Sequence, residues 1–213
     1  MISVFEQILH RAGLSPVAGA DEAGRGACAG PLVAAAVILR VDNPIDALRD
    51  SKALSASARE RLYPVIRRDA LAVSTAIIEA GQCDQLGIQQ ANLLALRQAI
   101  LGLEVEPGYV LTDGFHVDGL SSSSLGMWKA DQVAACVSAA SIVAKVTRDR
   151  IMDDVDSRYP GYEFSKHKGY ATRLHQRLLD ELGPCPQHRL SYANVAKVRR
   201  AAPTWVQEGF LLR

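Results

Sequence analysis

The feature of this sequence that most constrains its fold is a pair of apolar stretches of strand length that flank a charged, glycine-rich segment. Residues 17–20 and residues 31–40 are rich in valine, isoleucine and alanine, and Asp21, Glu22 and the Gly-Arg-Gly turn at 24–26 lie between them. Such runs bounded by glycines are typical of strands buried on both faces. The segment therefore predicts two central strands of a sheet, joined by a glycine-rich turn.

Hydrophobic periodicity predicts the remaining elements. Apolar residues at helical spacing predict four helices, over residues 55–68, 88–101, 132–159 and 172–182. Apolar runs of strand length predict three more strands, over residues 71–78, 109–112 and 125–129. Residues 1–15 predict a short amphipathic helix, and the four serines at 121–124 predict a mobile loop. This order of elements indicates an α/β fold around a central sheet.

The composition excludes several classes of protein. At 213 residues and 48% hydrophobic, the chain is long enough for one buried core, so we expect a single domain over residues 1–213. The four cysteines form no Cys-x-x-Cys pair, which argues against a zinc knuckle or redox motif and fits a reducing compartment. The longest apolar run, residues 31–39, is strand-sized, and residues 1–15 do not have the pattern of a signal peptide. We therefore expect a soluble, cytoplasmic protein.

Charge is distributed unevenly along the chain. Residues 1–144 hold 11 Lys/Arg and 15 Asp/Glu, whereas residues 145–213 hold 13 Lys/Arg and 8 Asp/Glu. A metal-using phosphodiesterase needs such a division, because carboxylates hold the metals and cations attract the phosphates. An asymmetry of this size is also common on solvated surfaces, so it indicates little by itself.

Acidic residues follow three of the predicted strands. Asp21 and Glu22 follow the first, Asp113 follows the strand over residues 109–112, and Asp131 lies just before the long helix. Each has a purely structural alternative: a solvated turn for the first pair, a turn for Asp113 and a helix cap for Asp131. Adjacent residues of a strand point to opposite faces, so Asp21 and Glu22 can converge only if the strand ends there. Against the alternatives, the carboxyl ends of strands are where α/β folds build their sites.

The residue types in this set favour a hard divalent ion. A cluster of carboxylates, with no Cys and no obligatory His, would select Mg²⁺ or Mn²⁺ and not zinc. Two such ions can hold a scissile phosphate, activate a water and stabilise the leaving oxygen. No Gly-x-x-x-x-Gly-Lys-Ser/Thr loop occurs, which argues against the common nucleoside triphosphate chemistry.

Glycines and basic residues supply a candidate phosphate-binding surface. Gly24 and Gly26 would let backbone amides approach a ligand closely while the Arg25 guanidinium reaches a phosphate. Residues 166–170, Lys-His-Lys-Gly-Tyr, read most simply as a solvated loop. Next to those cations, however, Tyr170 could stack on a base or a sugar.

Two other pairs of residues stand out. His188 and Arg189 follow a Cys-Pro turn and are expected to extend the positive surface. Trp128 and Trp205 are expected to be core or packing residues.

Several stretches, taken together in chain order, resemble bacterial type 2 ribonuclease H, the ribonuclease HII family. The resemblance covers nearly the whole chain, from about residue 17 to residue 195, and the joint occurrence of the stretches is specific although each alone is not. The stretches are residues 20–26 with 30–36, Asp50-Ser51-Lys52 with Leu54, Thr112-Asp113-Gly114, residues 139–150, and residues 168–172 followed by His188-Arg189.

The resemblance implies a fold and an activity. The fold would be ribonuclease H-like, a mixed central sheet flanked by helices, with a helical C-terminal part from about residue 160 to residue 213 that helps to grip the duplex. The activity would be hydrolysis of RNA in RNA–DNA hybrids and nicking of DNA duplexes on the 5′ side of embedded ribonucleotides, which leaves 5′-phosphates. It would use Mn²⁺ or Mg²⁺, with two ions when substrate is bound, and would serve in removing ribonucleotides from DNA. We expect a monomer.

The resemblance also implies roles for individual residues. The catalytic and metal-binding acids would be Asp21, Glu22, Asp113 and Asp131. Substrate would be bound by the backbone of Gly24, Arg25 and Gly26 at the ribonucleotide 2′-hydroxyl, by Lys52, and by Tyr170 stacking on the following deoxyribose. Such contacts can distinguish one 2′-hydroxyl from none.

The sequence departs from the family pattern at a few positions. Lys129-Ala130-Asp131 stands where relatives commonly have Lys-Gly-Asp, and Ala171 replaces a second glycine after the tyrosine. Only about 16 residues precede the first strand, which favours type 2 over ribonuclease HIII with its additional N-terminal domain. The rivals are another nuclease of the same superfold, such as a junction resolvase, and a non-catalytic nucleic-acid-binding module.

Overall fold

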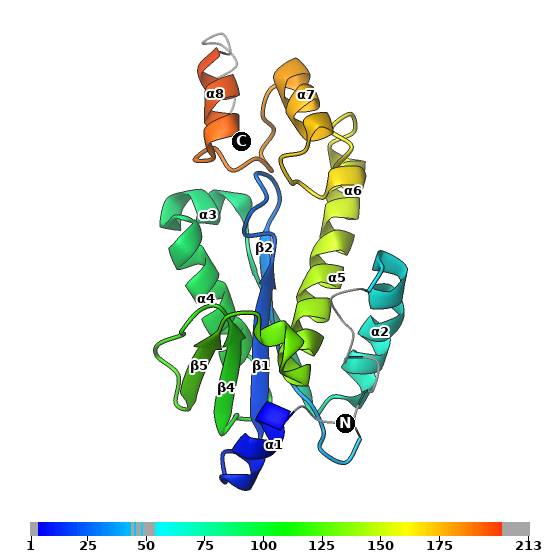
Figure 1. The fold of residues 1–213 in the computed structure, drawn as a ribbon. Helices are drawn as coiled ribbons and strands as arrows, with labels where there is room; N and C mark the ends of the chain where they lie inside the picture. The colour runs from blue at the N-terminus through cyan, green and yellow to red at the C-terminus, as the bar shows by residue number, and fades with distance from the viewer. Residues whose placement is uncertain (1–3, 44, 46–47, 49–53, 202–213) are drawn as a thin grey trace. The chain divides into compact units, whose positions relative to one another are not determined.

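The fold is that of a computed structural model, which describes residues 4–43, 45, 48 and 54–201 (Figure 1). The chain divides into two compact units. The sheet unit comprises Met1–Ala23, Val33–Ile77 and Asn92–Thr147, and the loop unit comprises Gly24–Leu32, Ile78–Ala91 and Arg148–Arg213.

The sheet unit is built on five strands in the order β3-β2-β1-β4-β5. Their bounds are β1 Val17–Ala23, β2 Leu32–Ile38, β3 Ala72–Ile78, β4 Tyr109–Asp113 and β5 Ser123–Met127. The central strand β1 pairs with β2 in antiparallel fashion and with β4 in parallel, and β4 pairs with β5 in parallel. The predicted mixed sheet is confirmed.

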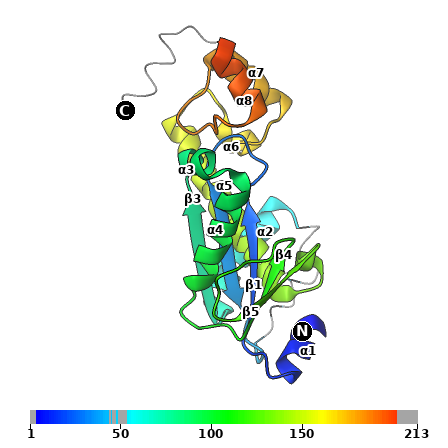
Figure 2. The ribbon, with the colours of Figure 1, turned by 90° about the vertical axis from the view of Figure 1, so that its left-hand side faces the viewer.

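Helices cover both faces of this sheet (Figures 1 and 2). On one face, alanines of β1 and β2 pack against α5 (Ala135–Arg158) and against Ile66 of α2 (Ala56–Asp69). α4 (Ile88–Leu101) lies over the opposite face, as the turned view shows. The alanine-rich faces of β1 and β2 let helices approach closely, and all seven residues of β2 are buried.

A short N-terminal helix, α1 (Val4–Arg11), is tied to the start of α5 by a buried acid. Glu6 is 5% exposed, and its carboxylate accepts hydrogen bonds from the amides of Ala135 (3.1 Å) and Cys136 (2.9 Å). These amides belong to the first turn of α5, where no carbonyl of the same helix is available to accept from them. Glu6 thus caps a helix that lies more than a hundred residues later in the chain.

Most predicted helices and strands are confirmed, but the end of the first strand, the serine run and Trp128 differ from what was expected. β1 does not end at Ala20, because its ladder with β2 continues to the pair Ala23↔Val33. Ser123 and Ser124 are not in a loop but begin β5, where the Ser124 hydroxyl donates to the carbonyl of Val117 (3.0 Å). Trp128 is not a packing residue, since it is 83% exposed. Trp205 lies outside the described residues.

The loop unit is mainly helical. It contains α3 (Ala80–Leu86), α6 (Phe164–His167), α7 (Arg173–Leu182), α8 (Ala193–Ala201) and the last turns of α5. A small core of Ala29, Met152, Val155, Tyr162, Phe164 and Cys185 joins α6 to the last turns of α5, and a second core of Cys28, Leu179 and Val195 joins α7 to α8. The predicted helical C-terminal part is confirmed, although α3, α6 and α8 were not predicted.

All four cysteines are free and buried. Within the described ranges, no helix is both long enough and apolar enough to cross a membrane.

Candidate active site

Asp21 and Asp113 come from neighbouring parallel strands. The β1–β4 ladder runs to the pair Ala20↔Thr112, so Asp21 and Asp113 are the next residues on the two strands. Residues in register on neighbouring strands point to the same face of a sheet. The strand pairing therefore brings the two carboxylates together at the carboxyl end of β4, as the sequence predicts.

The helix over this face can approach because of a glycine that the sequence analysis did not single out. A Cβ added to Gly19 would lie 2.2 Å from the amide nitrogen of Val137 in α5, so no other residue fits there. Gly19 shares its face of β1 with Asp21, two residues further on. The close approach allows the Ser141 side chain to hydrogen-bond to Asp21.

The environment of Asp21 disfavours the ionised form of its carboxyl group. Asp21 is 8% exposed, and its pKa is raised to about 8, first by burial, then by the charge of Glu22, and to a smaller extent by that of Asp113. Hydrogen bonds from Ser141 and from the Glu22 amide (2.8 Å) act in the opposite direction. A buried acid surrounded by other acids is a group that a bound cation would stabilise.

Glu22 reaches the site in a different way from the one predicted. It is paired with Ala34 inside the β1–β2 ladder, so strand alternation directs it to the face opposite Asp21. The strand end that was expected to bring the two together is absent at that point. Their charges are nonetheless close enough for Glu22 to raise the pKa of Asp21.

Asp131 lies on a turn that is fastened to Asp113. The carboxylate of Asp113 accepts a hydrogen bond from the amide of Ala130 (2.8 Å), which begins a 3₁₀ turn, Ala130–Gln132, that carries the half-buried Asp131. The predicted long helix starts only at Ala135, so Asp131 belongs to a separate turn before it.

The four acids fit a divalent ion by their chemistry more than by their present arrangement. All their donor atoms are carboxylate oxygens, the type that Mg²⁺ and Mn²⁺ prefer. Among the described residues, no three His, Cys, Asp or Glu side chains form a group that could hold a metal ion as they stand. Like charges repel in the absence of a cation, so closing around an ion requires the carboxylates to converge.

In the loop unit, the Gly24-to-Gly26 segment packs closely against a buried arginine, Arg148. Arg148 is fully buried and donates to the carbonyls of Pro31 (2.8 Å), Lys168 (2.9 Å) and Ala29 (3.0 Å). Gly24 has φ +92°, and a Cβ there would lie 1.9 Å from Nε of Arg148. This position therefore requires glycine for both its conformation and its space.

A second buried arginine holds the other side of the same loop. Arg189 donates from Nε and Nη2 to the carbonyl of Gly30 (3.1 and 2.9 Å) and from Nη1 to the carbonyl of Arg25 (3.2 Å). Tyr192 accepts from Arg189 (3.0 Å) and donates to the same Arg25 carbonyl (2.5 Å). Arg189 was predicted to extend a positive surface, but it is fully buried and shapes the loop from within.

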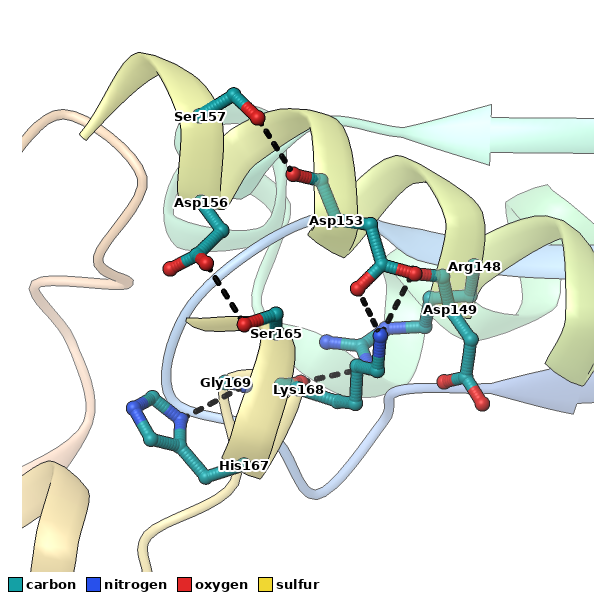
Figure 3. Close-up of polar contacts among 9 residues, drawn as sticks. All are labelled: Arg148, Asp149, Asp153, Asp156, Ser157, Ser165, His167, Lys168 and Gly169. Atoms are coloured by element: carbon teal, nitrogen blue, oxygen red, sulfur yellow. Dashed lines mark hydrogen bonds and ion pairs between the residues drawn. The ribbon is translucent and has the colours of Figure 1, made fainter. Parts of the chain in front are cut away.

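Tyr170 is positioned by Arg148 as well. Its half-buried ring lies under the guanidinium carbon at 5.3 Å from the ring centroid, a cation–π contact. Figure 3 shows the preceding segment fastened to α5: Lys168 forms an ion pair with Asp153 and also donates to the carbonyl of Asp149 (3.2 Å).

The run of residues 166–170, predicted to be a solvated loop, is thus largely paired within the unit. Lys166 forms an ion pair with Glu163 (2.6 Å), and His167 is buried, accepting from the amide of Gly169 (3.2 Å; Figure 3). These contacts leave the two lysines less available to phosphates than the sequence suggested.

Residues outside the predicted set shape the acid cluster of the sheet unit and, separately, the Gly24-to-Gly26 segment of the loop unit. They are Gly19, Ser141, Arg148, Arg189 and Tyr192. Arg148 and Arg189 lie in stretches that carry the resemblance, but nothing local in the sequence marks an arginine as buried. Lys52, the remaining predicted substrate residue, lies outside the described residues.

The mixed sheet, with Asp21 on β1 beside Asp113 at the carboxyl end of β4, has the architecture of the ribonuclease H-like nucleases. Comparison with known proteins then gives the family. The family model for Ribonuclease HII matches residues 18–195, and the chain belongs to the ribonuclease HII family. The chain is thus a ribonuclease H, an endonuclease of a family that depends on divalent metal ions.

Individual relatives agree with this assignment. The chain is 64% identical to "Ribonuclease HII" of Cutibacterium acnes over 92% of its own length and 97% of that protein. It is 55% identical to "Ribonuclease HII" of Rhodococcus erythropolis, over 91% of this chain and 87% of that one. Among solved structures, ribonuclease H2 from Pyrococcus horikoshii OT3 is similar with a TM-score of 0.77 at 27% identity, covering 87% of this chain and 97% of that chain.

Proposed function

We propose that this protein hydrolyses the RNA strand of RNA–DNA hybrids and nicks DNA duplexes on the 5′ side of embedded ribonucleotides. The products would carry a 5′-phosphate and a 3′-hydroxyl, and the activity would serve in removing ribonucleotides from DNA. The observation that carries the proposal is the buried Asp21 carboxyl in register with Asp113 on neighbouring parallel strands. We further expect a cytoplasmic protein that acts as a monomer.

Asp21, Glu22, Asp113 and Asp131 would hold the metal, Mn²⁺ or Mg²⁺, with two ions when substrate is bound. When bound, the ions supply an activated water and stabilise the charge that develops on the leaving oxygen. Ser141 orients the Asp21 carboxylate, and the amide of Ala130 orients that of Asp113 (2.8 Å). Support for this assignment comes from the burial and mutual repulsion of the acids, which a cation would relieve.

The segment after the acids would read the ribonucleotide. Gly24 follows Glu22 by only two residues, and the backbone of Gly24, Arg25 and Gly26 would contact the 2′-hydroxyl. Arg148 and Arg189 hold the carbonyls of this loop and leave Arg25 and Gly26 exposed, so its shape is set before substrate arrives. Tyr170 would stack on the next sugar, which restricts the nucleotide after the cut.

Cleavage mapping with Asp113→Asn tests the proposal. On a DNA duplex with one embedded ribonucleotide, the unmodified protein should give a single cut 5′ of that ribonucleotide in Mn²⁺ or Mg²⁺. The variant should lose at least about 10³-fold in rate, because it removes a metal ligand, yet bind the duplex as well or better, since a negative charge is gone. The matched control is Asp118→Asn, whose side chain is 83% exposed in the same unit and which should cut normally.

Three outcomes would contradict the proposal. Substantial activity in Asp113→Asn would overturn the metal assignment. Cutting of four-way junctions without cutting at the ribonucleotide would indicate a resolvase. Binding of the duplex without cleavage by the unmodified protein, in either metal, would indicate a binding module.

A further inference from the structure

Trp128 is a large aromatic side chain left in water. It is 83% exposed, on the turn that joins the end of β5 to the Ala130–Gln132 turn carrying Asp131. Indole is apolar apart from a single N–H, and leaving it in water is unfavourable unless something covers it. The functional assignment so far gives this residue no role.

The turn that carries Trp128 is held at a defined position. The carbonyl of Met127, one residue before it, accepts from the amide of Gly114 (2.9 Å). The amide of Ala130, two residues after it, donates to the carboxylate of Asp113 (2.8 Å). Both anchors lie at the carboxyl end of β4, next to a candidate metal ligand. The backbone on either side of Trp128 is therefore fixed next to Asp113, so that binding through the indole would cost little backbone conformational entropy.

Lys129 completes an unusual turn. Its φ is +60°, a left-handed conformation that is unfavourable for a residue with a side chain. Strained residues of this kind persist where the surrounding structure enforces them, and they concentrate at functional sites. The side chain is exposed, and within the described part of the chain no ion pair neutralises it. A cation thus stands beside acids that would otherwise repel a phosphate.

We propose that Trp128 and Lys129 form a contact surface for duplex nucleic acid at the edge of the acid cluster. The indole lies flat against sugar rings exposed in the minor groove, and the ammonium group lies near a backbone phosphate. An RNA–DNA hybrid offers a wide, shallow minor groove whose sugar faces are accessible, whereas its bases are already stacked. The inference rests on the proposed function for its substrate, and it assigns that substrate a contact in the sheet unit.

Fluorescence provides a direct test, because the chain has only two tryptophans. In Trp205→Phe, Trp128 is the sole reporter. In EDTA, where no metal is available for cleavage, saturating RNA–DNA hybrid should change its emission and reduce acrylamide quenching several-fold. Quenching that stays unchanged by the hybrid would overturn the inference. Protection that grows with protein concentration alone would also overturn it, since the indole would then bind a second copy of the chain.

Affinity measurements separate a contact from a structural role. Trp128→Ala should weaken hybrid binding about 5- to 30-fold at fixed salt, whereas Trp128→Phe should recover most of the affinity. The loss should appear in KM more than in kcat, with the unfolding midpoint unchanged. Leu101→Ala removes an apolar side chain that is 60% exposed on α4 and should bind as the unmodified protein does. Equal affinity of Trp128→Ala and Leu101→Ala would overturn the inference.

Single-stranded RNA of the same sequence distinguishes sugar packing from base stacking. If it protected Trp128 as well as the hybrid does, the duplex contact would be wrong. Failure of the proposed function is separately visible. If the hybrid protects Trp128 but is never cut, the contact surface is supported and the proposed function is wrong. If the hybrid is cut but does not protect Trp128, the proposed function is supported and the contact surface is wrong.

Discussion

The sheet unit buries an ionisable carboxyl group, that of Asp21, whereas the loop unit buries two guanidinium groups, those of Arg148 and Arg189. Asp21 is surrounded by Glu22 and Asp113, and its pKa is raised to about 8. Arg148 and Arg189 are surrounded by main-chain carbonyls. Burial, with a smaller contribution from Arg189, lowers the pKa of Arg148 only to about 10, so it stays charged at neutral pH.

The two units differ in whether their buried ionisable groups are stabilised by partners within the protein. Each arginine satisfies carbonyls of loops that otherwise have no regular structure, so the loop unit's charges stabilise its own fold. The acids of the sheet unit repel one another when they are ionised, and either a proton on Asp21 or an external cation relieves that repulsion. Substitutions at the arginines should therefore affect stability, and substitutions at the acids should affect activity.

The largest expected effect contrasts Arg148→Met with Asp21→Asn. Removing the guanidinium leaves three carbonyls without their donor, so the free energy of unfolding should fall by about 3–5 kcal/mol. Asp21→Asn should unfold at the same urea concentration as the unmodified protein or a higher one, while losing cleavage. Urea titrations measure the stability of the two variants. Equal destabilisation by the two substitutions would contradict the expected difference between the arginine and the acid.

Two glycines of the same loop test the role of Arg148 in the stability of the loop unit. Gly24→Ala places a Cβ against Arg148 and forces an alanine into φ +92°, which should cost about 1–3 kcal/mol of unfolding free energy. Gly26→Ala meets nothing within 4 Å and should leave the free energy of unfolding nearly unchanged. If Gly24→Ala were as stable as Gly26→Ala, the close packing of Gly24 against Arg148 would not determine the conformation of the loop.

Acid should weaken the loop unit through its histidines. Burial lowers the pKa of His175 to about 4 and that of His188 to about 3, and the two rings are hydrogen-bonded through their Nε2 atoms (3.0 Å). Below pH 6.5 the unfolded chain takes up protons that the folded chain refuses, so stability is lost as pH falls.

Between pH 6.5 and pH 5.5 the two histidines should contribute a loss of about 1–2 kcal/mol, which the raised pKa of Asp21 opposes because the folded chain keeps a proton there that the unfolded chain releases. Unfolding free energies at the two pH values measure it, and the double change His175→Gln with His188→Gln should reduce the difference. His116→Gln, at an exposed residue of the sheet unit, should leave it as it is. A pH dependence that survives the double change would assign the loss to other groups.

The smallest expected effect concerns selectivity. Tyr170→Ala should reduce cutting at a single ribonucleotide about tenfold more than cutting of long hybrids, because only the first substrate depends on one stacked sugar. Parallel rates on the two substrates measure the ratio. If both rates fell equally, Tyr170 would be a packing residue for Arg148 and not a selectivity residue.

Local sequence was sufficient for the elements that carry their own signals. Ser55 caps α2 by accepting from Ala58 (3.2 Å), and Thr172 caps α7 by accepting from His175 (3.2 Å), both within four residues. The apolar runs of β2 and β4 and the period of α4 are equally local. Such patterns depend on neighbours a few residues away, so a single sequence contains all the information needed.

The candidate acids could be found from the sequence, but their arrangement could not. Four acids after three predicted strands indicated the site, yet the reason that Asp21 and Asp113 meet is the parallel register of β1 and β4. The extension of β1 to Ala23 depended on a ladder with β2, which placed Glu22 on the other face. Strand partners are chosen by packing across the whole sheet, and no short window of sequence records them.

Sequence by itself thus indicated which residues to consider for the chemistry: the acids, the Gly-Arg-Gly turn and Tyr170. Only the tertiary structure decided that Gly19 admits α5, that Arg148 and Arg189 are buried under the loop, and that Trp128 faces water. Arg148 meets the carbonyls of Ala29 and Pro31 across more than 110 residues of chain. Contacts at that separation leave no periodic trace in the sequence, because each is made once, by the fold as a whole.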